Sequence, residues 1–127
     1  MILKLNRSES GFTLIELLTC CAIVSVLSGI CIQFFSEYKQ RAFDSQAESG
    51  LRNAVTAEEA IFADTEAYAD CVDAACQIVL PGYILTTNVN LSIVTRAGAA
   101  SYNGIASHPS GAKVFEFDSD IGLISSS

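Results

Sequence analysis

The sequence predicts an α+β fold, in which one long N-terminal α-helix packs on a small antiparallel sheet of three or four strands. Three observations lead to this prediction. The segment from Phe12 to Phe35 contains 24 residues, of which 17 are hydrophobic and one is charged. No proline occurs before Pro81, so no residue forbids one continuous helix through the first half of the chain. Beyond Pro81, short segments alternate between apolar and polar residues, which is typical of half-buried strands.

Composition and charge exclude several classes of protein. With 127 residues the chain has room for one small domain. Its net charge of −7 and its pI of about 4.4 disfavour direct binding of nucleic acid. The apolar segment 12–35 is the one run that approaches the ~20 residues needed to cross a bilayer, which excludes a multi-span transporter. A hydrophobic content of 50% excludes intrinsic disorder.

The N-terminal 35 residues consist of a short polar leader, residues 1–11, and the apolar segment 12–35. A helix over the apolar segment would be about 36 Å long, slightly more than the ~30 Å hydrocarbon core of a membrane. A secretory signal peptide has an apolar stretch about half as long, followed by a cleavage site between small residues. A lipoprotein anchor is disfavoured because Thr19, Cys20 and Ile30 precede the three cysteines of the segment, where a small residue is expected. We therefore expect a membrane-spanning helix.

Glu16 distinguishes this segment from a plain membrane anchor. An acidic side chain in an apolar span costs a few kcal/mol against lipid, and such residues are functional by default. The surrounding octapeptide, Gly11-Phe12-Thr13-Leu14-Ile15-Glu16-Leu17-Leu18, resembles the prepilin-peptidase site of type IV pilins and their relatives. It lies after a mildly basic leader and before an apolar helix, where that family has it. The resemblance is strongest over residues 8–45.

The resemblance implies a structural subunit of a type IV pilus that is not an enzyme and needs no cofactor. A prepilin peptidase would cut between Gly11 and Phe12, remove the leader 1–11 and methylate the new amine of Phe12. Glu16 would set the register of assembly. The implied partners are other copies of the chain in a helical homopolymer, the peptidase and methyltransferase, and an inner-membrane assembly platform. The precursor would reside in the bacterial inner membrane, and the assembled subunit in an extracellular filament.

Two positions of the apolar segment depart from the family pattern. Many pilins have a glycine where Ser25 stands and a proline where Gln33 stands, and their helix often unwinds between these positions in the filament. Gln33 retains a backbone N–H donor and lacks the steric clash of a proline. The sequence leaves open whether this helix unwinds on assembly.

Residues 36–127 predict the head of the molecule, which begins with an amphipathic helix that continues to about Tyr68. Its apolar stripe has spacings of three and four and comprises Phe43, Ala47, Leu51, Ala54, Val55 and Phe62. Charged residues are assigned to the other face, namely Glu37, Lys39, Arg41, Asp44, Glu48, Arg52, Glu58, Glu59, Asp64 and Glu66. A stalk or coiled coil is the alternative, but it would continue the stripe beyond Tyr68.

The sheet is predicted from alternating segments that follow this helix. Residues 89–94 and 113–118 show the clearest alternation, and 83–87 and 101–107 are weaker candidates. Turns are predicted at Pro81-Gly82, at Gly98 and over residues 108–111. Three or four such strands would cover the apolar stripe of the helix. A head of 92 residues is only a little above the size at which small cores need a staple or partners.

Cys71 and Cys76 lie in a polar connection after the helix, on the side of the membrane opposite the leader. In an oxidising periplasm, a structural disulfide is the natural interpretation. It would stabilise the head by about 2 kcal/mol. A redox-active dithiol and half of a zinc site are the alternatives, but the spacing is not C-x-x-C and no second ligand pair is present. In many type IV pilins the disulfide closes a larger C-terminal loop, so this position is a departure.

Few residues of the head suggest any other chemistry. His108 is predicted to be a turn residue rather than a catalytic one. Asp118 and Asp120 offer oxygen ligands for calcium, although an exposed acidic turn is favoured over a metal site. Cys20, Cys21 and Cys31 are interpreted as reduced, inert apolar residues of the membrane segment. The chain contains no motif of a serine hydrolase, a P-loop nucleotidase or a zinc protease.

Two alternative functions remain. A pseudopilin of a type II secretion system shares the peptidase site, and calcium near the C-terminus would favour it. A membrane-anchored periplasmic domain that never polymerises would retain an uncut N-terminus. Motility, adhesion, DNA uptake and secretion all use this subunit plan, so the sequence does not choose among them.

Overall fold

The computed structural model describes residues 11–96, 98 and 100–127. The predicted leader, apart from Gly11, lies outside the described residues. The chain divides into two compact units, with the boundary between Ser36 and Glu37. The first helix, α1, extends over Leu14–Thr65 and contributes residues to both units. Its N-terminal part is long and apolar enough to cross a membrane, by length and composition.

α1 ends three residues before the predicted end at Tyr68. Glu66 has a φ of 56°, and its N–H donates to the carbonyl of Phe62 over 2.8 Å. A residue in this left-handed conformation commonly terminates a helix, although glycine and asparagine adopt it more readily than glutamate. The helix is continuous through Ser25 and Gln33, the two positions that depart from the family pattern.

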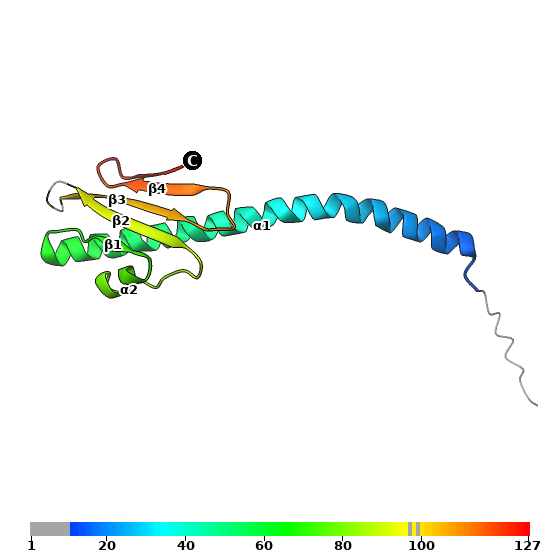
Figure 1. The fold of residues 1–127 in the computed structure, drawn as a ribbon, viewed down its shortest axis with the longest axis horizontal. Coiled ribbons are helices and arrows are strands. Elements are labelled where there is room, and N and C mark those ends of the chain that lie inside the picture. The colour runs from blue at the N-terminus through cyan, green and yellow to red at the C-terminus, as the bar shows by residue number, and fades with distance from the viewer. Residues whose placement is uncertain (1–10, 97, 99) are drawn as a thin grey trace, which may run out of the picture. The chain divides into compact units, whose positions relative to one another are not determined.

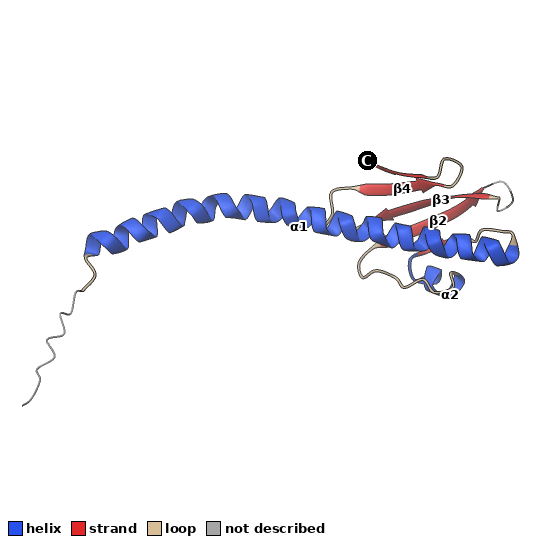
Figure 2. Ribbon diagram, turned by 180° about the vertical axis from the view of Figure 1, so that it is seen from behind, coloured by secondary structure: helices blue, strands red, loops and turns tan. Residues whose placement is uncertain are grey.

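The second unit contains a five-stranded antiparallel sheet, so the predicted α+β class is confirmed and the sheet has more strands than expected. The strand order follows the chain, β1-β2-β3-β4-β5. The strands are β1 Cys71–Val72, β2 Asn90–Arg96, β3 Ser101–Ser107, β4 Val114–Asp118 and β5 Leu123–Ser126. A 3₁₀ turn at Asp73–Ala75 and the short helix α2, Cys76–Val79, follow β1. Figures 1 and 2 show α2 at the β1 edge and the C-terminus at the opposite edge of the sheet.

The predicted strand at 83–87 is wrong, because this segment is irregular and ends in a turn. The edge of β2 that a further strand would need is occupied in part by β1, with Cys71 paired to Ile93. Tyr83 is nevertheless buried, so its segment is part of the core without joining the sheet. The three central strands lie where the alternation predicted them, within one or two residues.

The core lies between one face of the sheet and the second half of α1. The predicted stripe is confirmed, since Ala47, Leu51 and Ala54 are fully buried. Small residues allow a close approach, because a Cβ at position 104 would lie 3.0 Å from the Leu51 side chain. The remaining core side chains come from the sheet and its connections, mainly Cys71, Cys76, Leu80, Tyr83, Val89, Leu91, Ile93, Tyr102, Ala106, Phe115 and Phe117.

Two acidic residues that we assigned to the solvated face of α1 are buried instead. Asp44 and Glu58 are 7% and 0% exposed, respectively. Their positions continue the spacing of Ala47, Leu51 and Ala54, which places all five on one helix face. Asp44 is satisfied there, because its Oδ1 accepts hydrogen bonds from the backbone N–H groups of residues 112 and 113. This acid therefore attaches the connection between β3 and β4 to the helix.

His108 has a packing role in the turn where it was predicted. It is 7% exposed and its ring stacks on Phe43, with 4.3 Å between the ring centroids. Its Nδ1 accepts a hydrogen bond from the N–H of Ser110 over 3.0 Å. The lone histidine therefore covers the N-terminal end of the core stripe, at Phe43.

Candidate functional site

The predicted cleavage site lies immediately before α1. Gly11 and Phe12 are exposed, and Phe12 retains 87% of its accessible surface. A Cβ at position 11 would meet no atom of the described residues within 4 Å, and the backbone there does not adopt the left-handed conformation that favours glycine. The fold therefore imposes no requirement for glycine at this position. Any such requirement must come from another molecule.

Thr13 and Glu16 form a capping box at the start of α1. The backbone N–H and the hydroxyl of Thr13 donate to Oε2 of Glu16 over 2.9 and 2.8 Å. In return, the N–H of Glu16 lies 3.3 Å from the Thr13 hydroxyl oxygen. This reciprocal pattern satisfies helix donors that would otherwise lack partners. The Thr-x-x-Glu spacing is visible in the sequence, and it could have identified both the helix start and this role of Glu16.

The segment that follows exposes apolar side chains on all sides. Every residue from Gly11 to Ala42 is exposed in the isolated chain. Two hydroxyls of this segment are satisfied locally: those of Thr19 and Ser25 donate to the carbonyls of Ile15 and Cys21 over 2.8 and 2.7 Å. Such bonds reduce the cost of hydroxyl groups in an apolar environment. Cys20, Cys21 and Cys31 are exposed and carry free thiols.

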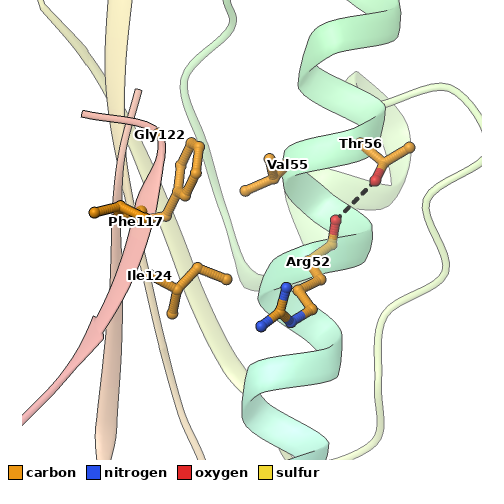
Figure 3. Close-up of a pocket in the computed structure, with 7 residues that line it drawn as sticks. Arg52, Val55, Thr56, Phe117, Gly122 and Ile124 are labelled. Carbon is orange, nitrogen blue, oxygen red and sulfur yellow. Dashed lines mark hydrogen bonds between the residues drawn. The ribbon is translucent and has the colours of Figure 1, made fainter. Parts of the chain in front are cut away.

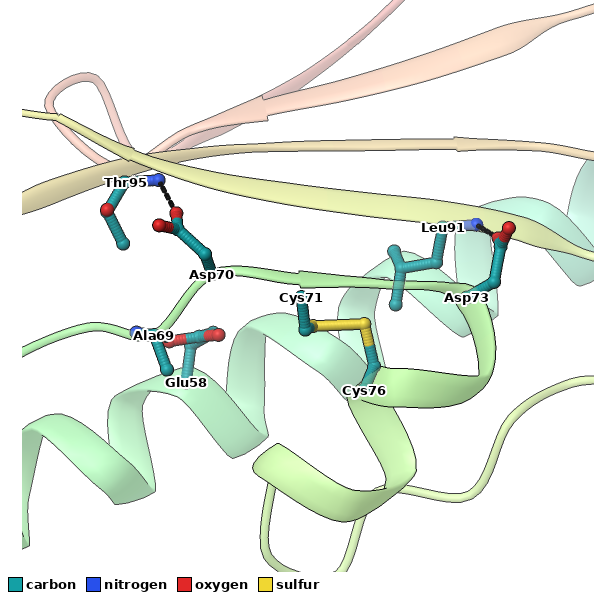
Figure 4. Close-up of a disulfide and its surroundings, with 8 residues drawn as sticks. All are labelled: Glu58, Ala69, Asp70, Cys71, Asp73, Cys76, Leu91 and Thr95. Atoms are coloured by element: carbon teal, nitrogen blue, oxygen red, sulfur yellow. Dashed lines mark hydrogen bonds between the residues drawn. A yellow bond between two sulfur atoms is a disulfide. The ribbon is translucent and has the colours of Figure 1, made fainter.

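The predicted disulfide between Cys71 and Cys76 is present, and two carboxylates hold the loop that it closes (Figure 4). Oδ1 of Asp70 accepts from the N–H of Thr95 over 2.6 Å, and Oδ1 of Asp73 accepts from the N–H of Leu91 over 2.9 Å. Both acceptors join the loop to β2. The hydrogen bond from Thr95 lowers the pKa of Asp70. Both cysteines are buried in the core, and these surroundings indicate a structural disulfide.

Glu58 is a buried acid with one of its two carboxylate oxygens unpartnered among the described residues. Its Oε2 accepts a hydrogen bond from the N–H of Ala69 over 3.1 Å, while Oε1 is buried without a partner among the described residues. Burial raises the pKa of Glu58 despite that hydrogen bond, and the negative charges of Asp70 and Glu59 raise it further. Burial also raises the pKa of Tyr102, whose hydroxyl lies 3.4 Å from Glu59.

Asp118 and Asp120, the candidate calcium ligands, both face Arg96. The guanidinium lies 3.0 Å from Asp118 and 4.0 Å from Asp120. The N–H of Asp120 and the Arg96 side chain lower the pKa of Asp118. Within residues 11–96, 98 and 100–127, no group of three or more histidine, cysteine or acidic side chains is arranged to hold a metal ion. The ion pair with Arg96 disfavours calcium at this turn.

Comparisons with known proteins place these features in a family. The family model described as the prokaryotic N-terminal methylation motif matches residues 6–32. The type IV wide pilus major component PilA4 of Thermus thermophilus is 35% identical over 117 residues, which are 92% of this chain and 87% of that protein. The type IV major pilin protein PilA of Myxococcus xanthus is 34% identical over 67 residues, 53% of this chain and 30% of that protein.

Three features therefore agree. The methylation motif contains the Gly11–Glu16 segment, the long helix α1 begins within it at Leu14, and the similarity to a pilin covers 92% of the chain. The chain belongs to the type IV pilin family.

Proposed function

We propose that this chain is a structural subunit of a type IV pilus, cut between Gly11 and Phe12, methylated at Phe12 and polymerised through the apolar first part of α1. Both relatives are described as major pilins or pilus components, which supports a structural rather than an enzymatic role. The head formed by residues 37–127 would then make up the outer part of the filament.

The observation that carries this proposal is the exposed apolar surface of residues 14–35. Phe34 and Phe35 are each 67% exposed, and Ile32 is 71% exposed. Removal of such side chains from water is favourable by about 25 cal/mol per Å². Lipid can cover this surface in the precursor, and the equivalent helices of neighbouring subunits can cover it in a filament. Assembly exchanges one apolar environment for the other.

Glu16 has a role in both environments under this proposal. Before assembly, Thr13 satisfies its carboxylate within the same helix. After cleavage, the positive amine of Phe12 in an incoming subunit can pair with a Glu16 carboxylate in the filament. In a water-poor core, one partner of such a pair without the other costs about 3–5 kcal/mol. This cost would fix the axial register of each subunit.

The partners follow from this sequence of events. A prepilin peptidase and methyltransferase would act on the precursor in the bacterial inner membrane, and an assembly platform there would insert subunits into an extracellular filament. The rival function, a pseudopilin, shares the methylation motif, but both relatives are described as a major pilin or a pilus component, and Arg96 lies against both candidate calcium ligands.

Substitution of Gly11 by valine tests the processing step. Gly11→Val should abolish cleavage without changing the fold, because the structure has space for the side chain. Gly29→Val is the matched control, since a side chain at position 29 also meets no atom within 4 Å. Intact-mass analysis should give a methylated chain that starts at Phe12 for the wild type and Gly29→Val. Assembled wild-type subunits that retain Met1 would contradict the proposal.

A further inference from the structure

Positive charge gathers in the head at the part of α1 where the second unit begins. Five lysine and arginine residues follow the leader, and three of them, Lys39, Arg41 and Lys113, form a group that we name the basic collar. Lys113 comes from the connection between β3 and β4, which reaches α1 in Figure 2. Its backbone N–H donates to Asp44 over 3.0 Å, and the residue lines the same surface hollow as Arg41. The fold thus brings together cations that are 72 residues apart in the sequence.

The acidic residues near the collar have partners of their own. Oδ1 of Asp44 accepts two backbone hydrogen bonds, and Oε1 of Glu48 lies 2.7 Å from Arg52. Arg52 belongs to a separate hollow, between α1 and β5 (Figure 3). Glu37 lies 4.0 Å from Arg41, and a pair as exposed as this one contributes little stability. Neither lysine of the collar forms an ion pair within the described residues. The charge of the collar is therefore available to an anionic partner.

The rest of the head is strongly acidic. Residues 53–112 and 114–127 contain nine acidic residues and one basic residue, Arg96. Arg96 is itself paired with Asp118 over 3.0 Å. An anionic surface would therefore attract the collar and repel the remainder of the head. The charge distribution favours one orientation of the head toward such a surface.

The collar follows the apolar segment closely along the chain. α1 is continuous past Phe35, the last residue of that segment, and Lys39 and Arg41 follow it by four and six residues. These separations correspond to about 6 and 9 Å of helix. The headgroups of a bilayer extend about 5–8 Å beyond the hydrocarbon core on each side. Tyr38, which is 73% exposed, also has the residue type that is enriched at membrane interfaces.

We propose that the basic collar binds the headgroup phosphates of anionic phospholipids while the precursor resides in the membrane. Arg41 and Lys113 would bind phosphate oxygens from two different elements of the head, and Lys39 would bind a neighbouring lipid. The acidic remainder of the head would stay in solvent. The contact would be lost when the subunit leaves the bilayer for a filament. The inference rests on the proposed function, because it needs the segment 12–35 to span a membrane.

The acidic surface of a second copy is the other source of negative charge that the collar could meet. Lipid is favoured because Tyr38, Lys39 and Arg41 follow the membrane segment directly, so that headgroups surround this part of α1 in the precursor. Lipid on all sides of a helix also imposes no common helix face on the cations. Lys39 and Arg41 are two residues apart, a spacing that places them on different faces.

Lysine reactivity tests the contact in the full-length precursor. Lys113 is the diagnostic residue, because Lys39 lies close to the bilayer in any chain that the segment 12–35 anchors. The precursor is reconstituted in nanodiscs of phosphatidylcholine, with or without phosphatidylglycerol, and is treated with a water-soluble acetylating reagent. Peptide mass spectrometry gives the rate of acetylation at each lysine. Arg96→Lys supplies a matched reporter in the acidic remainder of the head, and inorganic phosphate added to the phosphatidylcholine discs separates lipid from free phosphate.

Phosphatidylglycerol should slow the acetylation of Lys113 about fivefold, the effect of one lysine beside anionic lipid. High salt should reverse this protection. The lysine of Arg96→Lys should react equally in both kinds of disc, and inorganic phosphate should not slow Lys113. Equal rates for Lys113 in the two kinds of disc would overturn the inference. Protection by inorganic phosphate alone, or equal protection of the Arg96→Lys reporter, would overturn it as well.

A charge-removing substitution measures the affinity for lipid directly. Lys113→Gln keeps the hydrogen bond to Asp44, because the donor is the backbone N–H. Titration of the full precursor with phosphatidylglycerol, followed by native mass spectrometry, should show binding about fivefold weaker for Lys113→Gln. Arg96→Gln removes the same charge and should leave the affinity unchanged.

The outcomes separate the lipid contact from the proposed function. Unchanged lipid affinity of Lys113→Gln would contradict the contact. If that variant also gave less sheared filament than the wild type, Lys113 would belong to a contact between subunits instead. Absence of wild-type filaments from the native cell would contradict the proposed function alone, since the lipid contact needs only the membrane-spanning precursor.

Discussion

At the scale of single residues, the head contains two buried acids on one face of α1 that are satisfied to different extents. Asp44 accepts two backbone hydrogen bonds at 2.8 and 3.0 Å through one oxygen. Glu58 accepts one, and its second oxygen is buried without a partner among the described residues. A buried polar atom without a partner is costly, and more so when it is charged. Glu58 is therefore a local weakness of an otherwise well-packed helix face.

Glu58 should make the stability of the head fall as pH rises. Its pKa in the folded head is raised above the ordinary value of 4.5, so the folded state binds this proton more tightly than the unfolded state does. The resulting stability is fully present below pH 4.5 and is lost as the pH rises through the folded-state pKa. Asp70 and Asp118 have lowered pKa values, so their contributions are lost only as the pH falls below the ordinary value of 3.8. The loss of stability caused by Glu58 therefore occurs above pH 4.5, and the loss caused by Asp70 and Asp118 occurs below pH 3.8.

Thermal unfolding of residues 37–127 from pH 4.5 to pH 8, with and without Glu58→Gln, measures this effect. The fragment contains the whole core of the second unit. Glutamine keeps an acceptor for the Ala69 N–H and cannot ionise, so the melting temperature of Glu58→Gln should gain on that of the wild type as pH rises. A difference that is constant over this range would show that folding does not raise the pKa of Glu58.

The two buried acids also show why their burial could not be predicted from the sequence. Their spacing from Ala47, Leu51 and Ala54 favoured the buried face, but their charge favoured solvent. The carboxylate of Asp44 is accommodated by backbone donors 68 and 69 residues further along the chain. No local pattern reveals such donors. By contrast, the Thr13–Glu16 capping box is local, and its Thr-x-x-Glu spacing could have revealed it, although we did not predict it.

At the scale of elements, the loop from Asp70 to Cys76 covers the edge of β2, where a longer edge strand would otherwise pair. β1 has only two residues paired with β2. The disulfide closes the loop, and the carboxylates of Asp70 and Asp73 accept N–H groups of β2. Asp73 adopts a φ of 46°, a conformation that aspartate tolerates better than most residues. A short segment is thus held on the sheet edge by a ladder of two residue pairs, supplemented by side-chain hydrogen bonds and the disulfide.

Reduction of the disulfide should destabilise the head by about 2 kcal/mol, since closure of a short loop removes limited entropy from the unfolded chain. For a domain of this size, the melting temperature should fall by roughly 8–16 °C. The measurement compares Cys71→Ala/Cys76→Ala with the wild type over residues 37–127, with and without reductant. Reductant should lower the melting temperature of the wild type alone. No response of the wild type to reductant would contradict a stabilising disulfide.

The same elements explain which strands the sequence predicted. β2, β3 and β4 each contain five or seven residues with alternating burial, which the apolar pattern reports directly. β1 and β5 have two and four residues, and such short runs carry too little pattern to be recognised. The segment 83–87 contains three apolar residues and resembles a strand, yet Tyr83 enters the core from an irregular connection. Whether such a segment becomes a strand depends on whether a neighbouring strand edge is free to pair with it. That edge is formed by residues far away in the sequence.

At the scale of the whole molecule, the two units have different needs for burial. Residues 37–127 bury a core of their own, whereas every described residue from Gly11 to Ser36 is exposed in the isolated chain. Under the proposed function, lipid covers this first unit in the precursor and other subunits cover it in the filament. The apolar run that forms most of this unit can be recognised from the sequence, because it covers all faces of the helix and needs no tertiary information to be identified. Glu16 is the acidic residue in that run. Under the proposed function, its carboxylate has a different partner in the membrane than in the filament.

Substitutions at Glu16 should distinguish its charge from its role in the helix cap. Glu16→Ala removes both, and it should permit insertion and cleavage while it strongly reduces the yield of sheared filament. Glu16→Gln can retain the hydrogen bonds from Thr13, because glutamine also completes a capping box. It cannot pair with the Phe12 amine as an ion, which leaves a buried unpaired charge that costs about 3–5 kcal/mol. If the ion pair sets the register, both variants should therefore fail to assemble. The test expresses each variant as the only copy and compares trimmed, membrane-bound subunit with sheared filament, and normal yield from Glu16→Gln would assign Glu16 to the helix cap alone.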